Sequence, residues 1–133
     1  MLSTMIHFPG TCNEAISFYK DVLGAEIIAI DHFKDAPVDS DIELSLPQDF
    51  VMHSEILIFN STIIMTDGAE KEPSGDNFCF MITKETADEV TELYNKLLIN
   101  GKELEPLGPV FWASMYGMVE DRFGVNWQIM THK

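Results

Sequence analysis

Residues 13–19 read NEAISFY and residues 88–94 read DEVTELY, so one pattern of acidic, apolar and aromatic positions occurs twice, 75 residues apart. A leucine follows both copies at the same offset. After an insertion of two residues, GAEI at 24–27 matches GKEL at 101–104. An amphipathic helix that leads twice into the same Gly-x-Glu-apolar sequence indicates an internal duplication.

Both copies carry helix signals. In the first copy, Thr11 and Glu14 form a T-x-x-E capping box, and Gly24 follows the last apolar position, where a left-handed residue is favourable. In the second copy, apolar residues recur at helical spacing and Gly101 ends the run. The matched tyrosines of the two copies are expected to pack in the core with a hydrogen-bonded hydroxyl.

Segments typical of strands flank each helix. They lie at 4–8, 26–33, 50–59 and 62–66 in the first half, with a turn at 60–61, and at 78–83, 102–106, 111–120 and 125–130 in the second. Each half therefore reads β-α-β-β-β, and we expect an α+β fold with residues 1–133 as a single domain of two modules, at about 1–67 and 76–133. Because one module leaves an apolar sheet face open, paired modules are expected to form a curled mixed sheet around a cavity, with the pairing within a chain or between chains left open.

The composition of the chain limits the classes of partner that it is expected to bind. The 133 residues are 46% hydrophobic and carry 8 basic against 22 acidic side chains, for a formal charge of −14. Such a charge repels nucleic acid and anionic membranes, so neither is expected as a partner. The sequence has no long apolar run for a membrane span and no secretory signal pattern. Cys12 and Cys79 lack paired spacing, which predicts reduced thiols in a cytoplasmic protein.

Several stretches together identify a family resemblance. The most specific is FWASMYGMVEDRFGVNW at 111–127, supported by GTCNEAISFY at 10–19, LGAE at 23–26, VMHS at 51–54 and IMTD at 64–67. They resemble the vicinal-oxygen-chelate superfamily of glyoxalase I, bleomycin-resistance proteins and extradiol dioxygenases, and within it the PhnB-like branch. Some PhnB-like proteins carry ubiquinone methyltransferase labels, but this sequence has no glycine-rich nucleotide loop to support methyl transfer.

The resemblance also implies where a metal would bind. Metal enzymes of the superfamily place His, Gln or Glu ligands at four inward strand positions, two per half. In this chain the corresponding positions fall on Thr4, Asp67, Asn77 (or Phe78) and Gln128. A divalent ion needs more than one carboxylate among such weak oxygen ligands to compete with water. We therefore expect the usual metal site to be lost, and we predict no cofactor.

A second metal hypothesis rests on His53 and Glu55. These residues are two apart on an expected strand, so their side chains share a face. With His7 or His32 nearby, they could form a mixed nitrogen and oxygen site. A hydrogen-bonded structural histidine is the ordinary alternative, and the sequence leaves the two open.

The remaining candidates are aromatic and polar residues that could line a cavity, although core packing is an alternative for each. The residues expected to contact a ligand are Trp112, Tyr116, Gln128, Asn77, Thr4 and Phe8. We predict a homodimeric small-molecule-binding protein of the glyoxalase/bleomycin-resistance type that acts without metal catalysis. The alternative is a metal-dependent lyase, isomerase or dioxygenase acting on a small oxygenated substrate. A third possibility is a structural or regulatory dimer whose cavity is filled by side chains.

Overall fold

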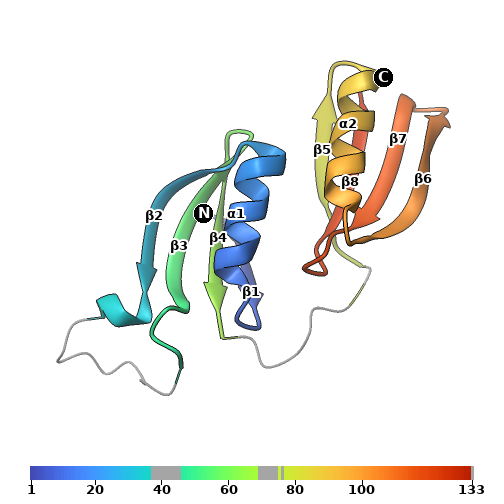
Figure 1. Cartoon of the computed structure of the whole chain (residues 1–133). Helices are drawn as coiled ribbons and strands as arrows, with labels where there is room; N and C mark the ends of the chain where they lie inside the picture. The colour runs from blue at the N-terminus through green and yellow to red at the C-terminus, as the bar shows by residue number, and fades with distance from the viewer. Residues whose placement is uncertain (37–45, 69–74, 76, 133) are drawn as a thin grey trace. The chain divides into compact units, whose positions relative to one another are not determined.

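The computed structural model describes residues 1–36, 46–68, 75 and 77–132. The chain divides into two compact units, Met1–Glu72 and Pro73–Lys133. Within the described residues, each unit contains one α-helix and four strands in the order β-α-β-β-β, as can be followed in Figure 1. The predicted α+β fold of tandem β-α-β-β-β modules is therefore confirmed, and within the described residues neither sheet closes into a barrel.

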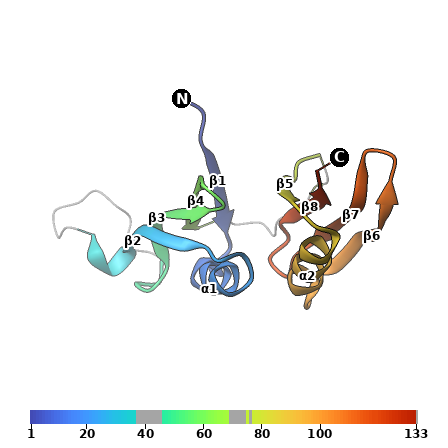
Figure 2. The ribbon, with the colours of Figure 1, turned by 90° about the horizontal axis from the view of Figure 1, so that it is seen from above.

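The first unit builds its sheet in the order β1-β4-β3-β2, with β1 parallel to β4 and the other neighbours antiparallel. Its elements are β1 (Thr4–Phe8), α1 (Cys12–Leu23), β2 (Glu26–His32), the 3-10 helix η1 (Phe33–Asp35), β3 (Val51–Ile58) and β4 (Ser61–Asp67). Along β3 the buried residues Ser54, Ile56 and Ile58 alternate with the more exposed His53 and Glu55. Helix α1 covers the buried face of this sheet (Figure 2).

The second unit repeats this topology in the order β5-β8-β7-β6, again with its first strand parallel to its last. Its elements are β5 (Phe80–Lys84), α2 (Ala87–Leu98), β6 (Lys102–Val110), β7 (Ala113–Glu120) and β8 (Asn126–Thr131). Helix α2 covers one face of this sheet (Figure 2). Val119 pairs with Trp127, and both are buried together with Ile129, two residues further along β8. The matched sequence copies thus form the helix of each unit and the start of the strand that follows it.

The two helices begin differently. Thr11 precedes α1, but its side chain makes no capping hydrogen bond, so the capping box predicted there is wrong. The cap comes instead from Asp67, whose Oδ1 accepts the backbone N–H of Cys12 at 2.9 Å. In α2 the threonine does cap the helix: Thr86 Oγ1 accepts the N–H of Glu89 at 3.1 Å and donates to the Glu89 carboxylate. Of the two copies, only the second therefore has a threonine side-chain cap.

The helix ends also differ from one copy to the other. Gly24 takes the predicted left-handed conformation, with φ 66°. After α2 that conformation falls on Asn100, with φ 60°, and not on Gly101. Gly101 is required for another reason: a Cβ there would collide with the backbone oxygen of Glu120. The glycine thus permits a close approach of two chain segments and does not cap the helix.

Both matched tyrosines are buried, as the sequence predicts. Tyr19 is fully buried and Tyr94 is 2% exposed. The Tyr94 hydroxyl donates to Glu103 Oε2 at 2.6 Å. Burial, and after it the Glu103 carboxylate, raises the pKa of Tyr94 well above its usual value. This residue therefore has the hydrogen-bonded hydroxyl expected of a core tyrosine.

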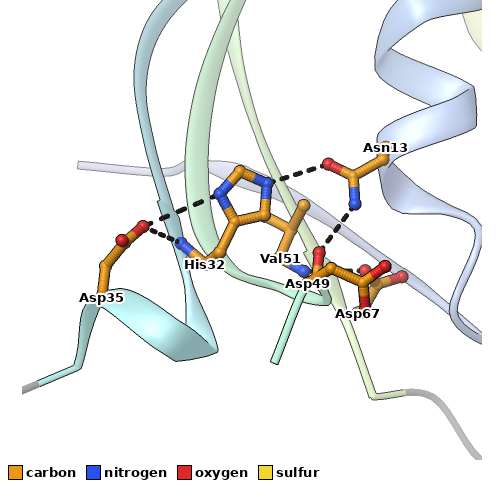
Figure 3. Close-up of polar contacts among 6 residues, drawn as sticks. All are labelled: Asn13, His32, Asp35, Asp49, Val51 and Asp67. Atoms are coloured by element: carbon orange, nitrogen blue, oxygen red, sulfur yellow. Dashed lines mark hydrogen bonds and ion pairs between the residues drawn. The ribbon is translucent and has the colours of Figure 1, made fainter. Parts of the chain in front are cut away.

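Asp67 joins three elements of the first unit. Its side chain is 5% exposed. Oδ1 accepts the N–H of Cys12 at the start of α1. Oδ2 accepts the N–H of Val51 at the start of β3, at 2.8 Å (Figure 3). Because Asp67 ends β4, one carboxylate fixes the ends of two strands and a helix. Charge-assisted bonds to buried amides are among the stronger hydrogen bonds in a protein.

We predict that Asp67→Asn destabilises the protein. A carboxamide offers one acceptor oxygen, and its NH₂ group would face a second N–H donor, so one buried amide loses its partner. Such a loss costs about 1–3 kcal/mol, measured as a lower urea midpoint at unchanged slope. Asp49→Asn is the matched control, because Asp49 is exposed and contacts Asn13 through its backbone oxygen. Equal losses in the two variants would contradict the role assigned to Asp67.

Candidate functional site

The face of each sheet that lies away from its helix is here called the open face. Strand alternation and register decide which side chains lie on it. In the first unit these include Met5, His7, His53, Glu55 and Thr66. In the second unit they include Met81, Tyr116, Met118, Gln128 and Met130.

The open face of the second unit brings together three of the predicted ligand contacts. Tyr116 on β7 pairs with Met130 on β8, and Gln128 lies two residues before Met130 on the same face. The centroids of the Trp112 and Tyr116 rings lie 5.5 Å apart, and the two ring planes meet at 76°. Trp112 is 38% exposed. An accessible indole in the turn before β7 thus lies beside a phenol on β7, and an amide lies on the adjoining strand β8. This arrangement suits the binding of an amphipathic molecule.

Sequence reasoning missed the thiol that lies next to Gln128. Cys79 Sγ lies 3.9 Å from Gln128 Oε1, and Gln128 Nε2 lies 3.9 Å from Met130 Sδ. Cys79 is half-buried, whereas Cys12 is fully buried. Burial, and after it the Asp67 carboxylate, raises the pKa of Cys12 to about 12. Strand parity was the signal for Cys79, because it lies two residues before Met81, which pairs with Gln128.

Tyr116 is held in its protonated form. Burial is the main cause of its raised pKa, followed by the negative charges of Glu105 and Cys79. The phenol therefore remains neutral throughout the physiological range and offers one donor and acceptor oxygen. It can orient a polar group of a ligand while its ring contacts an apolar one.

The other predicted contacts lie elsewhere. Asn77 is exposed and precedes β5. Thr4 pairs with the buried Ile63, so it lies on the face that α1 covers. Phe8 is on the same face and is fully buried, which is the core-packing alternative. Within its own unit, neither Thr4 nor Phe8 lies on the open face.

The residues at the superfamily's usual metal positions do not fit a divalent ion. Thr4 and Asp67 lie on the helix-covered face of the first unit, and both Asp67 oxygens already accept backbone N–H groups. In the second unit Gln128 is uncharged and Asn77 is exposed. Uncharged oxygen ligands bind such ions weakly.

The described residues do not support the second metal hypothesis, although its premise of a shared strand face holds. His53 and Glu55 share the open face of β3, and His7 Nδ1 lies 2.7 Å from Thr66 Oγ1. His32 is engaged elsewhere, with Nε2 3.0 Å from Asn13 Oδ1 and Nδ1 3.7 Å from an Asp35 oxygen (Figure 3). Across residues 1–36, 46–68, 75 and 77–132, no three His, Cys, Asp or Glu side chains gather closely enough to hold a metal ion.

The described helices include none that is long and apolar enough to cross a membrane.

Solved structures share the fold over nearly the whole chain. Protein PA1353 from Pseudomonas aeruginosa is 28% identical, with a TM-score of 0.83 over 99% of this chain and 97% of that one. The putative 3-demethylubiquinone-9 3-methyltransferase, PhnB protein, from Bacillus cereus is 23% identical, with a TM-score of 0.82 over 98% of each chain. The fosfomycin resistance protein FosX from Listeria monocytogenes, solved with Mn(II) and a sulfate ion, is 12% identical, with a TM-score of 0.69 over 100% of this chain and 92% of that one. The shared fold places the chain in the class of proteins built from tandem β-α-β-β-β modules.

Within that class, sequence comparison identifies the family to which the chain belongs. The family model described as 3-demethylubiquinone-9 3-methyltransferase matches residues 1–130. Protein YjdN of Escherichia coli K12 is 30% identical over 143 aligned positions, which cover 99% of this chain and 95% of that protein. The chain belongs to this PhnB-like family, as the sequence motifs predicted.

Glu105 provides a test of the environment of Tyr116. Glu105→Gln removes a negative charge, so we expect the pKa of Tyr116 to fall, although burial still holds it above the ordinary value of about 10. An NMR titration of ¹³C-labelled tyrosine rings reports the three tyrosines separately. Glu55→Gln, in the first unit, is the control and should leave Tyr116 unchanged. A Tyr116 pKa that does not respond to Glu105→Gln would place this carboxylate away from the phenol.

Proposed function

We propose that this protein binds a small, partly apolar organic molecule on the open face of its second unit, and that it acts as a homodimer in the cytoplasm. The observation that carries the proposal is the pairing of an accessible Trp112 ring with Tyr116, next to Gln128. Aromatic side chains with polar ends are the usual lining of small-molecule sites.

The expected binding energy comes mostly from apolar contact. Burial of apolar surface is worth about 25 cal/mol per Å² before association costs are subtracted. The Tyr116 hydroxyl and the Gln128 amide supply the oriented hydrogen bonds. A ligand that lacks matching polar groups would leave these groups unpaired, at a cost of roughly 1–3 kcal/mol each. The site thus favours a molecule with one apolar face and at least one hydrogen-bonding group.

The description of the family names a methyltransferase, whereas we propose binding for this chain. Methyl transfer from a nucleotide-containing donor calls for a recognisable nucleotide site. The eight glycines of the sequence are dispersed and form no glycine-rich loop. The aromatic pair and Gln128, by contrast, form a surface that suits an organic ligand directly.

The first test uses Trp112→Ala. Wild type and variant are screened by thermal shift against one panel of small oxygenated and aromatic compounds, in the presence of a metal chelator. We expect several compounds to raise the wild-type melting temperature and to lose most of that effect in Trp112→Ala, because the variant lacks the main apolar contact. Phe59→Ala, which removes a 44% exposed aromatic ring from the first unit, should retain the full shift. Equal shifts in wild type and Trp112→Ala would remove Trp112 from the site.

The proposal of a homodimer is based on exposed apolar side chains on the first strand of each sheet. Met5 on β1 is 51% exposed and Met81 on β5 is 59% exposed, and both strands are sheet edges. A second copy would cover such surface, which a monomer of charge −14 would otherwise leave in water. We expect the mass of a dimer in sedimentation velocity, and partial dissociation in Met5→Glu or Met81→Glu. Thr62→Glu, on exposed β4 surface, is the control. A monomer at all concentrations would refute the dimer.

The cytoplasmic location is supported by the thiols. Cys12 and Cys79 form no disulfide bond with each other, as is usual for thiols in a reducing compartment.

A further inference from the structure

Three aromatic rings form a row from the turn between β6 and β7 into β7. The centroids of the Phe111 and Trp112 rings are 4.7 Å apart, and the two ring planes meet at 85°. The Trp112 ring meets that of Tyr116 at a similar angle, 76°. Phe111 is 91% exposed, so one end of the row lies in solvent. Rings at nearly right angles form a corner, in which a compact group can contact the face of one ring and the edge of the next.

The charge beside this corner is negative. Glu105 on β6 pairs with Met118, which lies two residues after Tyr116 on the same face of β7. Glu105 is therefore a diagonal neighbour of Tyr116, at a Cα separation of about 7–8 Å. Burial, and after it the Glu105 charge, raises the pKa of Tyr116. The phenol itself is neutral, so the carboxylate gives the corner its charge.

Lys102 does not neutralise this charge. It lies on β6 at the other end of the sheet, where it pairs with Glu120. Glu120 is four residues beyond Tyr116, which is about 14 Å along an extended strand. The positive charge is thus far from the rings and already faces a carboxylate of its own.

We infer that the molecule bound on the open face of the second unit is an organic cation, whose alkylated ammonium group contacts Trp112 and Tyr116 beside Glu105. This inference rests on the proposed function, because it names the class of ligand for the same site. An indole face attracts a cation more strongly than a phenol or phenyl face does. Gln128 is diagonal to Tyr116 across β7 and β8, so it can bond a polar group at the other end of the molecule. The charge of the chain, −14, also favours the approach of a cation.

A neutral or anionic molecule of the same shape would use the site less well. The neutral form makes the same apolar contacts, but it gains nothing from the ring faces or the carboxylate. The anionic form is repelled by Glu105. Selectivity among the three forms therefore measures the inference, whereas affinity common to all three measures only apolar binding.

The test compares three probes of nearly equal shape: choline, its neutral carbon isostere 3,3-dimethylbutan-1-ol, and the anion 3,3-dimethylbutanoate. Each is titrated into ¹⁵N-labelled protein while the indole N–H signals of the two tryptophans are followed. Trp127 is the internal control, because it is 1% exposed and its indole donates to Asp121 at 2.8 Å. We expect the Trp112 signal to move, and choline to bind roughly three- to thirty-fold more tightly than the alcohol. The anion should bind most weakly.

Variants test which groups cause the preference for choline over the alcohol. Glu105→Gln removes the neighbouring charge and should lower this preference. Glu120→Gln is the matched control, because it removes the same charge from the same face at a greater distance from Tyr116 and should leave the preference nearly unchanged. Trp112→Leu keeps an apolar side chain without a ring face, so it should lose most of the preference. Melting curves show that each variant is folded before affinities are compared.

The outcomes separate the inference from the proposed function. Equal affinity for choline and the alcohol, with a shift at Trp112, would refute the cation and leave organic-ligand binding standing. No response of Trp112 to choline, or a preference that survives both Glu105→Gln and Trp112→Leu, would also refute the cation. The proposed function itself fails only if the compound panel stabilises wild type and Trp112→Ala equally.

Discussion

Each four-stranded sheet is covered on one face by a single helix, and this one-sided burial governs the rest of the structure. In the first unit Ile56, Ile58 and Met65 take the buried face, and in the second Val119, Trp127 and Ile129 do so. Hydrophobic burial fixes strand register, because a slip of one residue would move a whole set of side chains to the other face. Everything available for function within a unit is consequently on the open face or at a strand end.

The sequence repeat was enough to predict the fold, because the same chemical pattern in two places requires the same local structure. Alternation placed His53 and Glu55 on one face correctly. Prediction failed where a contact is made across the chain. The cap of α1 comes from Asp67, 55 residues after Cys12, and no local spacing can reveal such a partner. The sequence around Thr11 has the pattern of a capping box, but the backbone N–H of Cys12 is bound by the distant Asp67 carboxylate instead.

Prediction of the site also failed where it depended on which face of the sheet a residue occupies. Counting back from the helix motif placed the first metal position on Thr4, yet register with Ile63 puts Thr4 on the helix-covered face. His7, three residues later, lies on the open face beside Thr66. A shift by an odd number of residues, such as the three between Thr4 and His7, moves a position to the other face of the sheet, because side chains alternate along a strand. Trp112, Tyr116 and Gln128 belong to one continuous hairpin segment, and the count that reached Gln128 started only four residues away, at Gly124.

The two units share a topology and differ in the chemistry of their open faces. The first carries His7, His53, Glu55 and Thr66, whereas the second carries aromatic rings, an amide and sulfur atoms. Duplication explains this difference physically: once the helix-covered face secures each fold, the open face of either copy can change at little cost in stability. Substitution there alters exposed or half-buried side chains, whose effects on stability are usually within about 0.5 kcal/mol. The two units thus keep the same buried core and topology. The open face of the first unit is polar, whereas that of the second unit carries aromatic and sulfur-containing side chains.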